Sequence, residues 1–206
     1  MGLQATIAFE NKVREACQNI TTRVAMTLTS PFGVTRLISI SEVNSMNDER
    51  FEWVFRNVIE LCSEAAAHVK HMRPFKDVTD LCAAFSKYLN EVSYEEKLKV
   101  LMSHPDLAGR LAAQVELTQE SASEQHSAGL SDLSNAQKAI IDSSNKRYKE
   151  KFGFPFIICA RENKVQSIID GLNLRYGNTR DEEINIGINE VKKICKLRIL
   201  DIVKNE

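Results

Sequence analysis

Hydrophobic residues recur at helical spacing along most of the chain from about residue 47 onward. Apolar side chains at positions i, i+3, i+4 and i+7 share one face of an α-helix, and one such stripe runs from Phe51 to Cys62. Asn47 or Asp48 can cap the start of this helix, and Arg73-Pro74-Phe75 can end it. The pattern therefore predicts a helix that begins near residue 47 and ends at Arg73.

Six further helices are predicted by the same spacing and by residues that commonly cap helix ends. Ser93 and Thr179 each begin a capping box with a glutamate three residues later, and Ser134 can also cap a helix. Pro105 disfavours helical backbone at the preceding residue, so we expect one helix to end at His104. Glycines stand at the ends of three of these helices, where a left-handed residue fits well. The predicted helices cover approximately residues 78–89, 93–104, 118–129, 134–153, 165–177 and 179–202.

A short apolar run between two predicted helices departs from the helical pattern. It reads Phe154-Pro155-Phe156-Ile157-Ile158-Cys159-Ala160-Arg161. Its internal proline argues against a central strand, so we expect an extended buried segment whose unpaired backbone N–H groups can face a ligand. The predicted fold class is all-α, a single compact, bundle-like domain of about seven to nine helices in which this segment lines a pocket.

The composition is that of an ordinary globular domain, with 43% hydrophobic and 27% charged residues and a formal net charge of -1. The sequence contains neither a basic excess nor a basic block, so nucleic acid and anionic membrane surfaces are not the expected partners. Apolar runs fall short of the roughly 20 residues of a membrane span. We expect an intracellular protein whose partner is a small molecule.

The cysteines are odd in number and widely spaced, and none forms a C-x-x-C pair. This arrangement predicts neither a disulfide framework nor a zinc site. Most cysteines lie in apolar runs, where a reduced thiol behaves as a small buried hydrophobe. The five are Cys17, Cys62, Cys82, Cys159 and Cys195.

Residues 1–40 form a predicted N-terminal extension, and residues 41–206 form the predicted helical domain. Residues 17–41 contain no Asp or Glu but hold Arg23 and Arg36 among many Ser and Thr residues, as organelle transit peptides do. The favoured alternative is a poorly ordered or nonessential extension. The tail is not of the Ser-Lys-Leu type that directs proteins to peroxisomes.

His104 is the first candidate for proton transfer, because an imidazole exchanges protons near neutrality. The plainer alternative is a surface or helix-capping histidine. Ser121, Glu124 and Gln125 share one face of the predicted 118–129 helix. If Glu124 meets the imidazole of His104, it fixes the tautomer and raises the basicity of the ring.

Arg198 lies in the most apolar stretch of the last predicted helix, between Leu197 and Ile199. A guanidinium in such a place either extends to solvent or is held by an anion. A carboxylate substrate would suit its planar fork, which binds carboxylates with two parallel hydrogen bonds. Arg161 also follows an apolar run, and we expect it to anchor structure.

Five motifs, met in order along about residues 41–204, resemble the 2-oxo-4-hydroxy-4-carboxy-5-ureidoimidazoline (OHCU) decarboxylase family. They are Arg73-Pro74-Phe75, His104-Pro105-Asp106-Leu107-Ala108-Gly109, Ser121-x-x-Glu124-Gln125-x-x-Ala128-Gly129-Leu130, Phe152-Gly153-Phe154-Pro155-Phe156, and Glu190-Val191-Lys192-Lys193-Ile194 through Leu197-Arg198-Ile199.

The resemblance implies an all-helical homodimer, a lyase of purine metabolism that forms (S)-allantoin during urate degradation and uses neither a metal nor an organic cofactor. It makes His104 and Glu124 the catalytic pair and Arg198 the cation that binds the substrate. The substrate-binding positions that it implies are Pro105, Ser121, Gln125, Phe156, Ile157, Ile158, Cys159 and Ala160, the last five through backbone hydrogen bonds. Many animal members are peroxisomal, and the tail of this chain leaves peroxisome and cytoplasm both open.

The implied reaction needs no cofactor, because the substrate can act as its own electron sink. The protein has to orient the carboxylate, stabilise the developing enolate and deliver a proton to one face. We expect His104, oriented by Glu124, to transfer the proton near the substrate hydroxyl while Arg198 holds an oxygen of the substrate.

Two other functions fit the same residues. A cyclic ureide hydrolase of the same pathway can use a His–Glu pair to activate water, and carbon dioxide release separates the two reactions. A non-catalytic helical interaction module would carry the same polar residues on its surface. Convergence of His104, Glu124 and Arg198 on one closed pocket argues against that module.

Overall fold

The computed structural model describes residues 36–107 and 117–205, and the structural statements below concern these residues. The chain divides into two compact units, Met1–Leu37 and Ile38–Glu206. Residues 1–35, which make up nearly all of the N-terminal unit and most of the predicted extension 1–40, lie outside the described residues. Ala108 and Gly109, which end the His104 motif, lie outside them as well.

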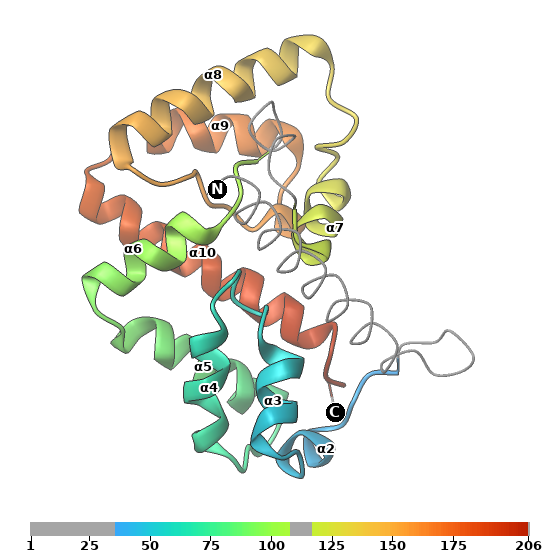
Figure 1. Ribbon diagram of the computed structural model, residues 1–206. Helices are drawn as coiled ribbons and strands as arrows, with labels where there is room; N and C mark the ends of the chain where they lie inside the picture. The colour runs from blue at the N-terminus through green and yellow to red at the C-terminus, as the bar shows by residue number, and fades with distance from the viewer. Residues whose placement is uncertain (1–35, 108–116, 206) are drawn as a thin grey trace, which may run out of the picture. The chain divides into compact units, whose positions relative to one another are not determined.

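The described part of the second unit is all-α, which confirms the predicted fold class (Figure 1). It holds nine α-helices and two short 3-10 helices, and none of these helices is long and apolar enough to cross a membrane. The elements are α2 (Ile40–Asn44), α3 (Asp48–Phe55), α4 (Ser63–Val69), η1 (Lys70–Met72), α5 (Val78–Glu91), α6 (Tyr94–Ser103), α7 (Gln119–Ser127), α8 (Asn135–Phe152), η3 (Ala160–Glu162), α9 (Val165–Arg175) and α10 (Arg180–Leu200).

Local capping chemistry sets the helix ends, as predicted from the sequence. Ser93, Ser134 and Thr179 each cap a helix, and the side chain three residues later completes a reciprocal capping box. Gly129 follows α7 at φ 82° and Gly153 ends α8 at φ 83°. This left-handed backbone is accessible to glycine without a steric penalty, which explains why both helices stop there.

The prediction of one continuous helix from residue 47 to Arg73 is wrong. α3 ends at Phe55 and α4 begins only at Ser63, although Asn47 caps α3 as expected. In the intervening turn, the Leu61 backbone has φ 49°, and its N–H donates to Asn57 Oδ1 at 3.0 Å. The hydrophobic stripe continues through this break, so periodicity gave no sign of it.

α2 was not predicted, because it is a single short helix. Ser39 caps it in a capping box with Glu42. Just before it, Ile38 pairs with the C-terminal end of the domain: its N–H donates to Ile202 O at 2.9 Å, and the Lys204 N–H donates to Ile38 O at 2.9 Å. This pairing ties the residues just before α2 to the C-terminal end of the described domain.

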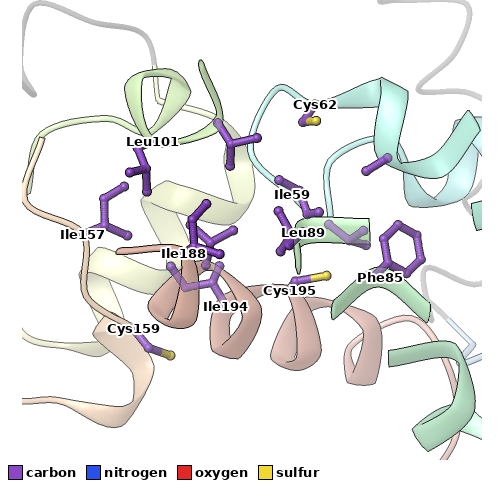
Figure 2. Close-up of a cluster of buried hydrophobic side chains, with 14 of the residues drawn as sticks. Ile59, Cys62, Phe85, Leu89, Leu101, Ile157, Cys159, Ile188, Ile194 and Cys195 are labelled. Carbon is purple, nitrogen blue, oxygen red and sulfur yellow. The ribbon is translucent and has the colours of Figure 1, made fainter. Parts of the chain in front are cut away.

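α10 is the central element of the described domain. It packs against α5 and α6, and Figure 2 shows side chains from these helices meeting around Ile188, Cys195 and Leu89. At Gly187 a side chain would start 2.9 Å from a methyl of Leu101, so α6 and α10 approach closely only because this residue lacks Cβ. α10 buries residues on several faces, which brings Arg198 into the interior.

The described cysteines are free thiols, in agreement with the prediction. Cys62, Cys159 and Cys195 are buried in the hydrophobic core, and Cys82 is partly exposed. Burial raises the pKa of the Cys195 thiol above its ordinary range, which keeps it protonated and unreactive. Cys17 lies outside the described residues.

Candidate active site

One cavity in the described domain brings together residues from several distant parts of the sequence. It contains about 380 Å³ of empty space, part of it open to solvent. Its lining residues are His104, Pro105, Leu107, Ser121, Glu124, Gln125, Phe156, Ile157, Ile158, Ala160, Ile194 and Arg198. The cavity thus gathers every predicted site residue except Cys159, and it adds Leu107 and Ile194.

His104 stands at the C-terminal end of α6, where Pro105 stops the helix as predicted. Its backbone is extended (φ -76°, ψ 142°). The ring nitrogen Nδ1 lies 2.8 Å from Val100 O. A carbonyl oxygen only accepts hydrogen bonds, so Nδ1 carries the proton and Nε2 presents a lone pair. Nε2 is buried and has no hydrogen-bond partner within the described part of the chain.

The imidazole of His104 is uncharged at neutral pH. Burial lowers its pKa from 6.5 to about 4, and this effect outweighs the Val100 hydrogen bond and the charge of Glu60, which raise it, while Arg198 lowers it further. A neutral ring with a free Nε2 is the form that can accept a proton from a ligand.

The segment after His104 is fixed by hydrogen bonds from two neighbouring helices. Asn145 of α8 donates to Leu107 O at 2.7 Å, and Lys149 lies 3.0 Å from the buried Asp106 carboxylate. Gln125 of α7 donates to Asp106 O at 3.4 Å. The Pro-Asp-Leu sequence of this motif therefore has a clear structural role, because it fixes the wall of the cavity next to the imidazole.

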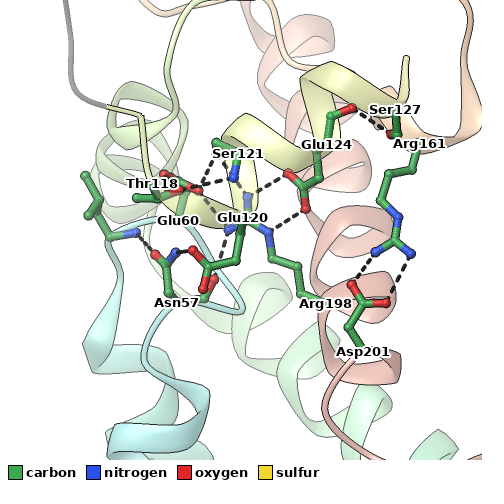
Figure 3. Close-up of polar contacts among 11 residues, drawn as sticks. Asn57, Glu60, Thr118, Glu120, Ser121, Glu124, Ser127, Arg161, Arg198 and Asp201 are labelled. Carbon is green, nitrogen blue, oxygen red and sulfur yellow. Dashed lines mark hydrogen bonds and ion pairs between the residues drawn. The ribbon is translucent and has the colours of Figure 1, made fainter. Parts of the chain in front are cut away.

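Arg198 lies at the centre of a buried polar network (Figure 3). A guanidinium has five N–H donors, and each has a protein acceptor here. Nε and Nη2 donate to the two Glu124 oxygens, both at 2.7 Å. Nη1 donates to Asn57 O at 2.9 Å and to Glu60 at 2.7 Å, and Nη2 also reaches Ser121 Oγ at 3.1 Å.

Arg198 is therefore held by anions and does not extend to solvent, since only 3% of its surface is exposed. Burial alone would lower the pKa of its guanidinium, but the hydrogen bonds and charges of Glu124 and Glu60 outweigh burial and raise the pKa. The sequence left both possibilities open, and the structure selects the held guanidinium.

The expected contact between Glu124 and His104 is replaced by another pairing. Both Glu124 oxygens accept from Arg198, and the partner that fixes the His104 tautomer is the Val100 carbonyl. The physical reason is local. The Val100 carbonyl, four residues before His104, lies within hydrogen-bond distance of the ring nitrogen Nδ1, while a guanidinium provides Glu124 with two charge-assisted hydrogen bonds at once.

Glu60 is a member of this network that sequence reasoning missed. It follows the end of α3 and is 1% exposed. Its carboxylate accepts from Thr118 at 2.8 Å and from Ser121 at 2.9 Å, in addition to Arg198. Burial would raise the pKa of Glu60, but the Arg198 charge and these hydrogen bonds outweigh it and lower the pKa. The sequence signal that could have identified Glu60 is a charged residue inside the otherwise apolar run Val58-Ile59-Glu60-Leu61.

The extended segment before η3 forms the apolar wall of the cavity, as predicted. The Arg175 side chain supports it by donating to Ile157 O at 2.7 Å and by stacking over the Phe156 ring, 4.4 Å from its centre. Cys159 does not line the cavity. Its side chain lies in the core (Figure 2), and its N–H donates to Glu190 at 2.8 Å. That N–H is therefore committed to the protein.

Arg161 anchors the end of this segment, as expected. Its guanidinium meets the Asp201 carboxylate through two hydrogen bonds just beyond the end of α10 (Figure 3). The pair is partly exposed, so we expect its contribution to stability to be small. Its position between η3 and the C-terminal turn gives it a bracing role at the edge of the site.

A family model described as OHCU decarboxylase matches residues 44–200, which include the cavity-lining residues. The chain belongs to the OHCU decarboxylase family. This confirms the resemblance drawn from the motifs, and it places the helices from α3 to α10 within the part that defines the family.

Individual members of the OHCU decarboxylase family agree with this assignment. The chain is 41% identical over 169 residues to the 2-oxo-4-hydroxy-4-carboxy-5-ureidoimidazoline decarboxylase of Xenopus laevis, covering 82% of this chain and 97% of that protein. It is 41% identical over 167 residues to the protein of the same name from Amia calva, covering 81% of this chain and 95% of that one.

A solved structure titled as OHCU decarboxylase in the presence of (S)-allantoin superimposes with a TM-score of 0.58 at 26% identity. The superposition covers 76% of this chain and 97% of that one. The aligned part is nearly the whole of that chain, and the family model covers α3 to α10 here, so the fold of this family corresponds to the described helical domain.

Proposed function

We propose that this protein decarboxylates OHCU to (S)-allantoin in urate degradation, with stereospecific protonation, as a carboxy-lyase. The observation that carries the proposal is the cavity in which a neutral imidazole with a free Nε2 stands beside a guanidinium held by two carboxylates. The names of the family members supply the substrate.

The substrate defines what the cavity has to do. By its name, OHCU carries a carboxylate and a hydroxyl on the same ring carbon. Decarboxylation breaks the bond between that carbon and the carboxylate, and the electron pair left behind delocalises into the adjoining unsaturated ring. A proton must then reach a ring carbon from one face, which fixes the product as a single enantiomer.

His104 is the proposed acid–base residue. Once carbon dioxide has left, the hydroxyl belongs to an enol, and the neutral Nε2 accepts its proton as the oxygen becomes a carbonyl. The resulting imidazolium then donates that proton to the neighbouring ring carbon, and the ring nitrogen that took up the electron pair of the broken bond is protonated by water. The Val100 carbonyl holds the Nδ1 proton throughout, so one nitrogen performs both transfers. Burial disfavours the charged imidazolium, which makes it a ready donor once the carboxylate has left.

Arg198 and Glu124 are the proposed pair that recognises the anionic substrate. The Nε and Nη2 donors of Arg198 form an edge that binds a carboxylate at two points, and Glu124 occupies that edge here. Ser121 and Gln125 extend this polar side of the cavity. We propose that substrate oxygens take over hydrogen bonds that Glu124 now accepts.

The backbone of the extended segment is the proposed source of further donors. Phe156, Ile157, Ile158 and Ala160 line the cavity, and their apolar side chains exclude water from the polar groups opposite. Cys159 is removed from this set, because its N–H is used by Glu190. We propose that the remaining segment and Pro105 hold the ring of the substrate.

One assay distinguishes the proposed decarboxylase from the two alternative functions, a cyclic ureide hydrolase and a non-catalytic interaction module. We generate OHCU in place from urate with the upstream enzymes, then measure carbon dioxide release and the circular dichroism of the allantoin formed. The proposal expects accelerated release and one enantiomer. Ring opening without carbon dioxide would identify a cyclic ureide hydrolase, and unchanged spontaneous decay would leave a helical interaction module.

On the basis of the family resemblance, we propose that the protein forms a homodimer and lies in the peroxisome or the cytoplasm. Light scattering of the purified chain measures its molar mass and tests the dimer directly. Localisation of the full chain with a small epitope tag, compared with a peroxisomal and a cytoplasmic marker, distinguishes between the two compartments.

His104 should remain uncharged from pH 8 down to about pH 5. Its pKa of about 4 lies below the ordinary 6.5 because burial penalises the charged ring. The unfolded chain therefore binds more protons between these two values, and folding stability should fall as the pH drops through this window, by up to about 3 kcal/mol.

The measurement is an NMR titration of the ring Cε1–H resonance that disappears in His104→Asn. A midpoint near 4 agrees with the structure, whereas a midpoint near 6.5 would mean that the ring is hydrated and accessible to solvent. The exposed ring of His126 on the neighbouring helix α7 serves as the internal comparison.

A further inference from the structure

Two carboxylates share the guanidinium of Arg198, and their surroundings differ. Glu60 is 1% exposed and lies behind the cavity wall, whereas Glu124 lines the cavity. The Glu60 carboxylate also accepts hydrogen bonds from Thr118 and Ser121, so three side chains hold it. The hydrogen bonds that hold the Glu124 carboxylate come from Arg198.

We propose that Glu60 is the permanent counter-ion of Arg198 and a positioning residue for the reaction, and that Glu124 is the carboxylate that the substrate displaces. This inference rests on the proposed function and deepens it. Glu60 does not touch the substrate in this scheme. It acts through Arg198 and Ser121, which do line the cavity.

The two sides of the Arg198 guanidinium have different partners, which supports the proposal. Nη1 points away from Glu124 and is committed to Glu60 and to the Asn57 carbonyl. Both acceptors come from the turn where α3 breaks off, so the break that the periodicity failed to predict builds the rear of the site. The opposite edge, Nε and Nη2, is left for a carboxylate on the cavity side.

Charge gives the second argument. Arg198 with Glu60 and Glu124 carries a net charge of -1, which opposes entry of another anion. If the substrate carboxylate replaces Glu124 on the guanidinium, Arg198 binds two carboxylates both before and after substrate binding. This exchange requires the negative charge of Glu60. Without Glu60, Glu124 is the sole counter-ion of Arg198 and is harder for the substrate to displace.

Glu60→Gln tests the proposal, because it preserves the size of the side chain and removes its charge. We expect KM for OHCU to rise about 10- to 100-fold with a much smaller change in kcat, since Arg198 is then misplaced and held by Glu124 alone. Glu60→Asp keeps the charge but has a shorter reach, so its KM should fall between those of wild type and Glu60→Gln. Glu64→Gln, an exposed glutamate at the start of α4, is the matched control.

A second readout needs no substrate. The Glu60 charge raises the pKa of His104, so the His104 titration midpoint should move to lower pH in Glu60→Gln and return towards the wild-type value in Glu60→Asp. A purely structural role would move neither the midpoint nor KM. This titration also separates the two ideas, because it tests the charge coupling even if the wild-type protein releases no carbon dioxide from OHCU.

Two results would overturn the proposal. Wild-type KM together with an unmoved His104 titration in Glu60→Gln would make Glu60 a structural residue. Loss of kcat at unchanged KM would place Glu60 in the chemical step instead of in substrate binding. If Glu60→Gln does not fold, as judged by circular dichroism, Glu60→Asp is measured in its place and must show the same direction of change in KM.

Discussion

His104→Asn should abolish enzymatic acceleration of OHCU decarboxylation while leaving the helical fold intact. Asparagine places an amide where the imidazole stood and removes the lone pair that accepts the hydroxyl proton. General acid–base catalysis by a single positioned side chain is worth about 10²- to 10⁴-fold, so kcat/KM should fall by at least about 100-fold. The readout is carbon dioxide release together with the circular dichroism of the allantoin.

The matched control is His126→Asn. His126 is an exposed histidine on α7, and its Nδ1 lies 3.2 Å from Ser131 Oγ, away from the cavity lining. This variant should keep wild-type kcat/KM. If His104→Asn also kept it, proton transfer by His104 would be excluded, and an identical loss in both variants would point to an effect on folding.

Many of the helix ends were predictable because each of these depends on a few neighbouring residues. A capping box needs a hydroxyl and a side chain three residues later, and Ser93, Ser134 and Thr179 all form one. The termination at His104 likewise follows from the proline after it. Local sterics and hydrogen bonding decide these features, and the sequence contains all the information that they require.

The break between α3 and α4 could not be predicted in the same way. The stripe residues Phe55, Val58 and Ile59 are all buried, as a continuous helix would also require. At this break the Glu60 carboxylate and the Asn57 carbonyl both accept hydrogen bonds from Arg198, which lies more than a hundred residues later. Hydrophobic periodicity reports burial, but it does not report a long-range ion pair.

Most of the predicted site residues line one cavity, but Cys159 does not, Glu60 was missed, and Glu124 is paired with Arg198 instead of His104. The motifs named His104, Glu124 and Arg198, and all three line one cavity. Assigning Glu124 to Arg198 instead of His104 required knowing which groups are closest, and a buried guanidinium competes strongly for carboxylates. The carbonyl of Val100 as partner of the imidazole has no sequence signal, because every residue has a carbonyl.

Arg198→Met should strongly destabilise the described domain. It removes the positive charge between two carboxylates, one of them, Glu60, almost completely buried. Breaking a buried ion pair by removing one partner costs about 3 to 5 kcal/mol, because the remaining charge is left uncompensated. Urea unfolding followed by circular dichroism measures this loss, and OHCU turnover should be lost as well.

Arg198→Lys separates charge from geometry. Lysine keeps the positive charge but has three donors and no planar fork, so it cannot serve Asn57, Glu60, Ser121 and both Glu124 oxygens together. Its stability should lie between those of wild type and Arg198→Met, whereas kcat/KM should still fall by about 100-fold. Near-wild-type turnover in Arg198→Lys would show that a positive charge alone suffices for catalysis. The paired Nε and Nη2 donors of the guanidinium would then be unnecessary.

The double variant Glu60→Gln/Arg198→Met decides how much of the loss comes from the stranded carboxylate. With Glu60 neutral, the buried site no longer holds an unpaired charge, so the double variant should be more stable than Arg198→Met alone. Activity should not return, because the edge that binds the substrate carboxylate is still missing. If the two substitutions destabilise additively, Glu60 and Arg198 are not energetically coupled, and the ion pair at the rear of the cavity contributes nothing that hydration could not replace.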